Sequence, residues 1–220
     1  MAKILVICAH PDDETLGLGG TLAGSSKKGD QTCIVFFTDG QFDRDITKRG
    51  IEYRKKNAKQ ACSILGVKKT EFLNYKDQTL DTIPVVELAC KIENYIKKWN
   101  PEIIFTHFWG DVNQDHRKLF EATIIATRPT SNSKIKQVIC YETPSSTEWG
   151  FSQFRPNYFV DIKGTINKKI NAMKKYKNEI EKYPHPRSLK AIKNRSMYWG
   201  SSIGLSYAES FYIFREINRN

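Results

Sequence analysis

The sequence predicts an α/β fold built on a mostly parallel sheet. Residues 4–8 and 32–37 are short, continuous apolar runs rich in β-branched residues, which is typical of strands buried on both faces. Segments with helical spacing follow these runs, at 15–28 and 47–65. Regular alternation of strand and helix implies right-handed crossover connections between parallel strands.

The remaining elements follow the same pattern as far as residue 140. We expect further strands at 70–73, 103–106 and 136–140, and further helices at 84–99 and 116–127. The last third is less regular, and there we expect strands at 157–160 and 211–214 and helices at 164–183 and 188–199. Because the chain shows no repeat, low-complexity tract or linker, we expect one domain spanning residues 1–220.

Composition is that of a folded globular protein. Of the 220 residues, 40% are hydrophobic and 27% are charged, which excludes a disordered chain. The apolar run at the start is too short for a signal peptide, and no run approaches the roughly 18 residues that span a bilayer. We therefore expect a cytoplasmic protein.

The five cysteines are widely spaced without a C-x-x-C pair, so we expect reduced, buried thiols.

The formal net charge is +11, which is compatible with nucleic acid, an anionic membrane or a phosphorylated substrate. The lysines are dispersed in pairs along the chain, and the aromatic residues do not interleave with them as a stacking platform requires. We therefore expect an anionic small molecule and no nucleic-acid partner. A homo-oligomer remains open.

A cluster of chemically active side chains follows the first strand. His10, Asp12, Asp13 and Glu14 lie at the carboxyl end of that strand, where ligands bind in open α/β sheets. His10 and Asp13 are three residues apart, so one turn can direct both at the same metal ion. Asp12 is then left over as a base near the metal. The alternative is that Pro11-Asp12-Asp13-Glu14 only starts a helix.

A second cluster lies at the end of the strand at 103–106. His116 begins the following helix on the same edge of the sheet as His10. Together with Asp13 these histidines give three protein ligands and leave one position open, which is the pattern of a catalytic zinc site. Asp115 is placed to orient one of the ligands.

A serine motif competes with this interpretation. Residues 200–204 match the G-x-S-x-G nucleophile pattern. A helix precedes them where a strand should, and no histidine follows Ser202. We therefore expect a helix C-terminus and turn at this position.

The chain resembles the PIG-L/LmbE-like family of zinc-dependent N-deacetylases. The resemblance is carried by Ala9-His10-Pro11-Asp12-Asp13-Glu14, Thr38-Asp39-Gly40, Arg54 before Leu65-Gly66-Val67, Asp77 with Leu80, Asp115-His116-Arg117, and Pro184-His185-Pro186-Arg187-Ser188. It implies a Rossmann-like three-layer sandwich. It also implies one zinc ion per chain on His10, Asp13 and His116, with Asp12 as general base, and removal of acetyl from an N-acetylglucosamine-type sugar.

One position departs from the family pattern. Many members carry a histidine where this chain has Asn113, and that histidine is proposed to act as an acid or oxyanion donor. An asparagine donates a hydrogen bond but delivers no proton. His185, or alternatively His107, is expected to supply that function, although His185 between two prolines also fits a rigid surface turn.

Three further residues are candidates for binding the sugar. Arg54 and Asp77 offer charged hydrogen bonds, and Trp109 offers a stacking face. Each has a simpler interpretation, as a solvated helix residue, a solvated loop carboxylate and a core ring respectively.

The expected reaction is hydrolysis of the acetamido group of an amino sugar, free or linked to a nucleotide or a lipid. An amidase of a sugar-thiol conjugate uses the same chemistry on another amide. A non-catalytic anion- or nucleotide-binding α/β module is the competing class, and its positive charge would serve to bind the anion.

Overall fold

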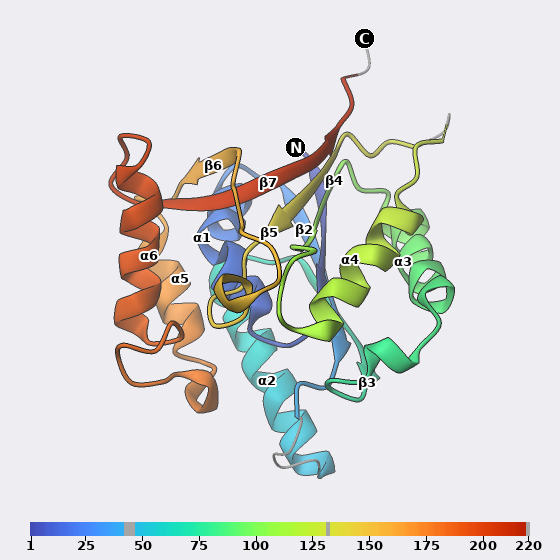
Figure 1. Cartoon of the computed structure of the whole chain (residues 1–220), viewed down its shortest axis with the longest axis horizontal. Helices are drawn as coiled ribbons and strands as arrows, with labels where there is room; N and C mark the ends of the chain where they lie inside the picture. The colour runs from blue at the N-terminus through green and yellow to red at the C-terminus, as the bar shows by residue number, and fades with distance from the viewer. Residues whose placement is uncertain (42–46, 131–132, 219–220) are drawn as a thin grey trace.

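Seven strands form one sheet in the order β3-β2-β1-β4-β5-β7-β6 (Figure 1). The computed structural model describes residues 1–41, 47–130 and 133–218. The strands are β1 (Lys3–Cys8), β2 (Gln31–Thr38), β3 (Lys69–Tyr75), β4 (Ile103–His107), β5 (Gln137–Tyr141), β6 (Tyr158–Asp161) and β7 (Ala208–Glu216). Strands β1 to β5 pair in parallel, and β7 runs antiparallel to β5 and β6. The predicted α/β fold with a mostly parallel sheet is confirmed.

Helices cover both faces of the sheet. They are α1 (Asp13–Lys27), α2 (Lys48–Leu65), α3 (Val85–Trp99), α4 (Gln114–Ala126), α5 (Ile166–Met173) and α6 (Leu189–Ser201), with short 3-10 turns η1 (Leu80–Thr82), η2 (Thr147–Trp149) and η3 (Lys177–Glu179). Residues of α1, α2, α5 and α6 pack on one face, and residues of α3 and α4 pack on the other. The result is the three-layer sandwich implied by the family resemblance.

Strand β1 shows why the sheet is buried on both sides. Ile4 and Val6 belong to the core beneath α1 and α2, while Leu5 and Ile7 belong to the core beneath α3 and α4. Alternate side chains of a strand point to opposite faces, so a strand between two helical layers must be apolar throughout. This is the physical origin of the continuous apolar run in the sequence.

The order of the strands places a crevice at the carboxyl end of β1. The chain leaves β1 through α1 toward β2, and it returns through α3 to pair β4 with the other side of β1. Helix α1 lies on one face of the sheet and α3 lies on the other, so the two connections leave a gap between the carboxyl ends of β1 and β4. Ligands bind in such a crevice in open α/β sheets. His10 follows β1, and His107 ends β4.

Two glycines let α1 approach the sheet closely. A β-carbon at Gly17 would overlap the ring of Tyr141, and one at Gly20 would lie 2.7 Å from Cγ2 of Ile162. Helix α1 is also interrupted at Leu18, whose backbone is non-helical. The amides of Gly20 and Thr21 donate instead to the buried carboxylate of Glu209. Side-chain acceptors of this kind replace helix hydrogen bonds at a kink.

Three predictions need correction. The helix expected at 164–183 ends at Met173, because Tyr176 and Glu179 turn into the core and the chain must leave the helix to bury them. Helix α4 starts at Gln114 rather than 116, since Asn113 caps it. Cys90 is an exposed thiol, while the other four cysteines are buried as expected.

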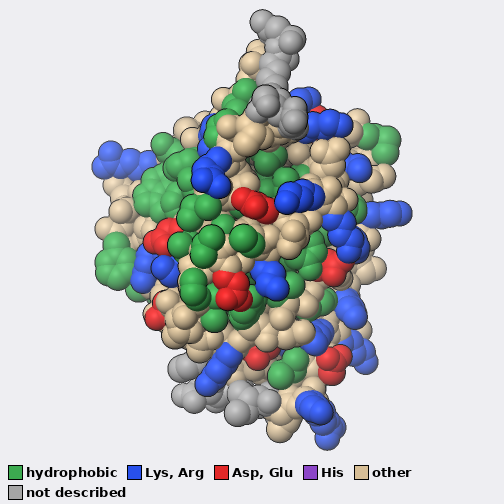
Figure 2. All heavy atoms as spheres, turned by 90° about the vertical axis from the view of Figure 1, so that its right-hand side faces the viewer, with side chains coloured by type: hydrophobic (Ala, Val, Ile, Leu, Met, Phe, Trp, Pro, Cys, Tyr) green, Lys and Arg blue, Asp and Glu red, His purple; other side chains and the backbone are tan. Residues whose placement is uncertain are grey.

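Positive side chains are not gathered into one patch on the face over α3 and α4 (Figure 2). Figure 2 shows the face over α3 and α4, where lysine and arginine side chains alternate with acidic and apolar ones. Among the described residues, no helix is both long enough and apolar enough to span a membrane. Ser202 is the C-terminal cap of α6, so the G-x-S-x-G match lies at a helix end, as predicted.

Candidate metal and catalytic site

His10 and Asp13 converge at the start of α1. Both are buried, and Nδ1 of His10 lies 3.5 Å from Oδ2 of Asp13. The backbone amide of His10 donates to that same Oδ2 at 2.7 Å. This bond fixes the Asp13 carboxylate and leaves its second oxygen, Oδ1, directed at His116 Nε2, 3.5 Å away.

His116 reaches the same point from α4. Its Nε2 lies 3.2 Å from His10 Nδ1. On the other side of the ring, Oδ2 of Asp111 lies 3.2 Å from Nδ1. A carboxylate behind one ring nitrogen favours the tautomer whose other nitrogen presents a lone pair to a metal. The first turn of α4 and the loop after β4 therefore orient His116 together.

These three side chains fit a metal ion. Their ligand atoms lie within 4.8 Å of one another, and buried Asp13 Oδ1 has no hydrogen-bond partner in the described part of the chain. Two imidazole nitrogens and an unpaired carboxylate oxygen form a suitable donor set for a divalent metal. Buried polar atoms are otherwise almost always paired, and a metal ion held by these side chains would supply the missing partner of Asp13 Oδ1.

A second group of possible ligands shares His10. Its Nε2 lies 2.9 Å from Oδ1 of Asp77 and 3.3 Å from Oδ2 of Asp115. However, the carboxylate of Asp115 already accepts hydrogen bonds from the backbone amides of Gln78 and Leu80. Each oxygen of Asp115 therefore already accepts one hydrogen bond, whereas Oδ1 of Asp13 accepts none from the described residues. The group of His10, Asp13 and His116 is thus the better candidate metal site, and Asp77 and Asp115 are carboxylate partners of His10.

The electrostatics of the cluster favour a cation. Burial lowers the pKa of His116, but the carboxylates of Asp111 and Asp13 outweigh burial and raise it to about 9. Burial also lowers the pKa of His10, and hydrogen bonds to Asp115, Asp13 and Asp77 raise it well above its usual value. Carboxylates outnumber histidines here, so the site attracts positive charge, which a divalent ion supplies.

Asp12 lies beside this cluster in an unusual backbone conformation. Its φ is 135°, a value that is strained for any residue with a β-carbon. The side chain is fully buried, and neither carboxylate oxygen has a hydrogen-bond partner among the residues described. Burial raises the pKa of Asp12 to about 6, although Arg187 and Arg54 act to lower it.

Two arginines and a glutamate surround Asp12. Arg54 Nη2 and Arg187 Nη1 each lie 3.5 Å from Oδ2 of Asp12. Glu179 bridges them, because Oε1 pairs with Arg54 and Oε2 accepts from Arg187 at 2.9 Å. Helix α2, turn η3 and the segment before α6 are thereby joined around one carboxylate.

Comparison with known proteins identifies the family. The family described as "PIG-L: GlcNAc-PI de-N-acetylase" matches residues 5–127, more than half of the chain. The chain belongs to the PIG-L family. The family is described by a de-N-acetylase activity, and the matched segment contains His10, Asp12, Asp13 and His116.

Relatives of this PIG-L protein extend the match beyond that segment. The uncharacterized deacetylase YaiS of Escherichia coli (strain K12) is 34% identical over 181 residues, covering 80% of this chain and 90% of the relative. Diacetylchitobiose deacetylase of Thermococcus kodakarensis is 29% identical over 220 residues, covering 94% and 81%. The crystal structure of the conserved protein TT1542 from Thermus thermophilus superposes with a TM-score of 0.81 at 26% identity, covering 100% and 98%.

Three further residues predicted for the site of this PIG-L protein lie close to the cluster of His10, Asp13 and His116. Asp77 and Asp115 both contact His10. The side-chain oxygen of Asn113 accepts from the backbone amide of Asp115 at 2.9 Å. Its carbonyl is therefore used as the N-cap of α4, and its amide group retains the capacity to donate.

The two histidines proposed as alternatives differ in surroundings. His107 is fully buried, stacks on His116 with ring centroids 3.9 Å apart, and accepts the backbone amide of Ala9 at Nε2. Burial and the charge of His116 hold the pKa of His107 well below its usual value. His185 is half-buried and lies edge-on to the exposed ring of Trp149. Of the two, His185 is the one that borders solvent.

Trp109 and Arg54 have contacts that bear on their predicted roles. Trp109 packs among aromatic rings contributed by α4, β7 and its own loop, namely Phe108, Phe120, Tyr212 and Phe214. These contacts match its simpler interpretation as a packed ring.

Arg54 is only 6% exposed, so it is not a solvated helix residue, and its guanidinium faces Asp12.

Sequence reasoning missed three residues of the site. Asp111 orients His116, and Glu179 and Arg187 complete the group around Asp12. A carboxylate five residues before His116 was a usable signal for Asp111, because metal-bound histidines usually have such a partner. No local pattern connects residues 54, 179 and 187, which only the fold brings together.

Proposed function

We propose that this protein is a zinc-dependent hydrolase that removes the acetyl group from an N-acetylated amino sugar. The observation that carries the proposal is the convergence of His10, Asp13 and His116 beside Asp12, whose buried carboxylate accepts no hydrogen bond from the described residues. Three protein ligands with room for a further ligand are typical of catalytic rather than structural zinc sites. Membership of a deacetylase family supports the same reaction.

The chemistry divides between the metal and the protein. Zinc held by His10, Asp13 and His116 would polarise the amide carbonyl and lower the pKa of a water molecule in the site. Asp111 and Asp77 hold the two imidazole rings in place from behind. Second partners of this kind fix ring orientation and raise ligand basicity.

Asp12 is the general base. Its carboxylate oxygens are buried and make no hydrogen bond to other described residues, so a lone pair is available for the proton of an attacking water molecule. The same carboxyl group then delivers that proton to the nitrogen of the departing amine. Arg54 and Arg187, each 3.5 Å away, limit how far the carboxylate can rotate.

Donors around the cluster complete the site. The amide group of Asn113 and the imidazole of His185 are the proposed hydrogen-bond donors toward the oxyanion and the leaving group. Arg54 and Asp77 are proposed to contact sugar hydroxyl groups, since each also borders the catalytic residues.

The substrate class follows from the relatives. One of them is named for diacetylchitobiose, an N-acetylated sugar. An acetamido group on a small sugar is therefore the first candidate for the amide that is hydrolysed. A phosphate or nucleotide on that sugar was expected from the net charge, and this expectation is tested by the same panel of substrates.

The decisive experiment is a screen for amine release with metal control. Purified protein is stripped with a chelator, reloaded with zinc, and assayed on N-acetylated mono- and disaccharides, their phosphorylated and nucleotide-linked forms, and an N-acylated sugar-thiol conjugate. We expect zinc-restored amine release from an acetylated sugar. Release from the thiol conjugate alone would identify an amidase, and anion binding without any release would identify a non-catalytic module.

A further inference from the structure

One of the four tryptophans is exposed close to the proposed site. The other three are engaged, because Trp99 and Trp199 donate their indole N–H groups to other residues and Trp109 packs among aromatic rings. Trp149 lies in η2, is 56% exposed, and donates no hydrogen bond from its indole to the described residues. Tryptophan is highly buried on average, so an exposed indole beside a proposed active site is a candidate surface for a ligand.

The ring of Trp149 borders the segment that reaches the proposed base. Its centroid lies 6.1 Å from that of His185, with the two ring planes at 76°. Nδ1 of His185 accepts the backbone amide of Arg187, whose Nη1 lies 3.5 Å from Oδ2 of Asp12. An edge-on contact covers at most one face of the indole, and His185 is the only described ring that contacts it. One face of Trp149 therefore stays available beside the site.

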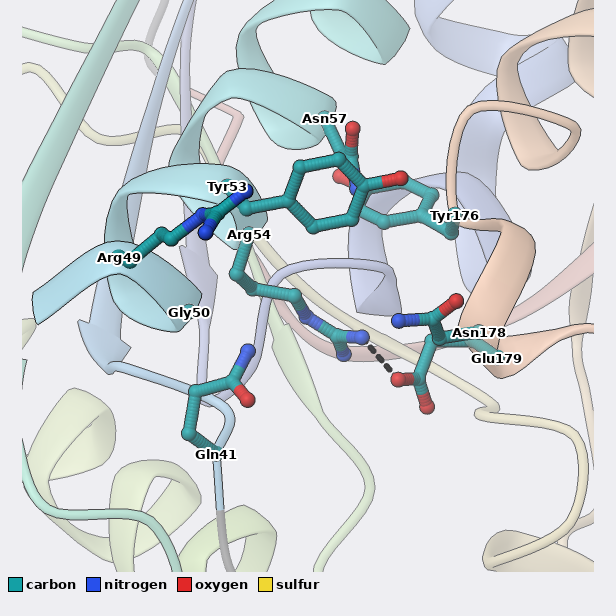
Figure 3. Close-up of a pocket in the computed structure, with 9 residues that line it drawn as sticks. All are labelled: Gln41, Arg49, Gly50, Tyr53, Arg54, Asn57, Tyr176, Asn178 and Glu179. Carbon is teal, nitrogen blue, oxygen red and sulfur yellow. Dashed lines mark hydrogen bonds and ion pairs between the residues drawn. The ribbon is translucent and has the colours of Figure 1, made fainter. Parts of the chain in front are cut away.

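Arg187 joins the loop that carries Trp149 to the charged group around the base. Its Nη1 donates to Oε2 of Glu179 at 2.9 Å, and the other oxygen of Glu179 pairs with Arg54, as Figure 3 shows. Nε of Arg187 donates to Oγ of Ser145 at 2.7 Å. Ser145 lies just before η2 in the chain, so one guanidinium contacts both the surroundings of the base and the start of this loop.

The loop is also fixed to the metal side of the site. The hydroxyl groups of Ser146 and Thr147 both donate to Asp111, the carboxylate behind a proposed metal ligand. Beyond η2, the backbone amide of Phe151 donates to a carbonyl oxygen of the loop after β4 at 2.6 Å. Trp149 lies between these attachment points. A side chain on a loop held in this way loses little freedom when a ligand binds, which favours binding.

The chemistry of the indole suits a sugar ring. Trp149 offers a planar apolar face and, at its edge, an N–H group that only donates. A pyranose presents apolar C–H groups on its faces and hydroxyl groups at its edge, so both parts of the indole can be satisfied by one ring. Aromatic faces with a few placed polar groups are the usual lining of small-molecule sites.

We propose that Trp149 is the platform on which the sugar ring stacks while its acetamido group lies at the metal. This assignment rests on the proposed function, and it gives Trp149 the role that the sequence suggested for Trp109. Stacking holds the ring equally in the bound substrate and in the transition state. Trp149 is therefore a substrate-binding residue whose loss raises KM and leaves kcat unchanged.

The test separates a stacking face from simple apolar bulk. Amine release from N-acetylglucosamine is measured with the zinc-loaded chain and with Trp149→Leu, which removes the ring, and Trp149→Phe, which keeps a smaller one. Phe151→Leu is the matched control. It makes the same kind of change on the same loop, at a 76% exposed ring whose centroid lies 4.8 Å from the guanidinium carbon of Arg117.

We expect Trp149→Leu to raise KM by about 3- to 10-fold, the effect of losing one aromatic stacking contact. Its kcat and its metal content should stay unchanged, Trp149→Phe should recover part of the loss, and the control should keep the original KM. An unchanged KM in Trp149→Leu would overturn the proposal. A fall in kcat without a change in KM, or an equal rise of KM in the control, would do the same, since either would indicate a structural effect of the loop.

Direct binding separates the platform from the proposed function. Glucosamine, which carries no acetyl group, is titrated into the zinc-loaded chain and into Trp149→Leu while tryptophan fluorescence is recorded. A change in emission that the variant loses supports the platform even if no acetylated sugar releases amine. An equal change in both chains, or none in either, rejects the platform, and normal amine release from the variant then leaves the proposed function intact.

Discussion

Oδ2 of Asp111 lies 3.2 Å from Nδ1 of His116, on the side of the ring opposite the metal cluster. The same carboxylate accepts hydrogen bonds from the hydroxyl groups of Ser146 and Thr147. Asp111 therefore joins a proposed metal ligand to the loop after β5. Hydrogen bonds and the charge of His116 lower the pKa of Asp111 to about 2 despite its burial, so it is a carboxylate throughout the physiological range.

Replacement of Asp111 should weaken metal binding without removing a ligand. Asp111→Asn has nearly the same shape and keeps one acceptor oxygen for these hydroxyl groups, but it removes the charge behind His116. We expect zinc affinity to fall by roughly 10- to 100-fold, as is usual for the partner of a metal-bound histidine. Competition with a fluorescent chelator measures this change. Asp161→Asn, at an exposed carboxylate in β6, is the control, and equal affinity in both variants would remove Asp111 from this role.

The ligands themselves should be indispensable for metal content. His10→Ala and His116→Ala each remove one of three donors from a site that holds a single ion, so metal per chain should fall from about one to near zero. Elemental analysis after dialysis against zinc gives the content, and circular dichroism confirms that the fold is kept. His185→Ala removes a histidine outside the ligand set and should retain its metal. Full metal content in both ligand variants would show that the ion is bound elsewhere.

Two glycines of α1 offer a matched stability test of how tightly this helix packs. A β-carbon at Gly17 would overlap the Tyr141 ring and lie 2.8 Å from the carbonyl oxygen of Glu142, while one at Gly24 would meet nothing within 4 Å. Gly17→Ala should therefore lower the free energy of unfolding by about 1–3 kcal/mol through overpacking. Gly24→Ala should raise it by roughly 0.5–1 kcal/mol through helix propensity. Urea unfolding of both variants measures the difference, and destabilisation of equal size would contradict the close packing at Gly17.

The strands of the sheet could be predicted because a strand that is buried on both faces appears in the sequence as a continuous run of apolar residues. Val6 and Ile7 point to opposite faces and are both fully buried, so the strand is apolar throughout. The end of α2 was equally visible, since Gly66 adopts the left-handed conformation of a helix C-cap. The helix expected at 164–183 was wrong because a spaced apolar pattern does not reveal that Tyr176 is turned inward toward Glu14.

The candidate site was predictable where its residues are close in sequence. His10, Asp12 and Asp13 fall on a strand end and the first turn of a helix, so spacing alone relates them. The surroundings of Asp12 were not predictable, because Arg54, Glu179 and Arg187 come from distant segments that tertiary packing brings together. The prediction that Trp109 stacks on a sugar rests on residue type alone, and residue type does not reveal that its ring packs against Phe120.

The division of roles between adjacent aspartates gives the sharpest test of the mechanism. Asp13 is assigned to the metal, whereas Asp12 is assigned to the water molecule and the amine, so Asp12→Asn should keep both the metal and the fold. The amide has nearly the same shape but takes no proton, and general-base catalysis typically contributes about 10²–10⁴-fold. We expect amine release to fall by roughly that factor, mainly in kcat, because the loss affects the transition state more than substrate binding. Metal per chain and amine release are measured on the same preparation, with Asp13→Asn as the paired variant that should lose both. Parallel loss of metal and activity in Asp12→Asn would make Asp12 a ligand, and full activity with full metal would move the base to another carboxylate, with Asp115, 3.3 Å from His10, as the next to be replaced.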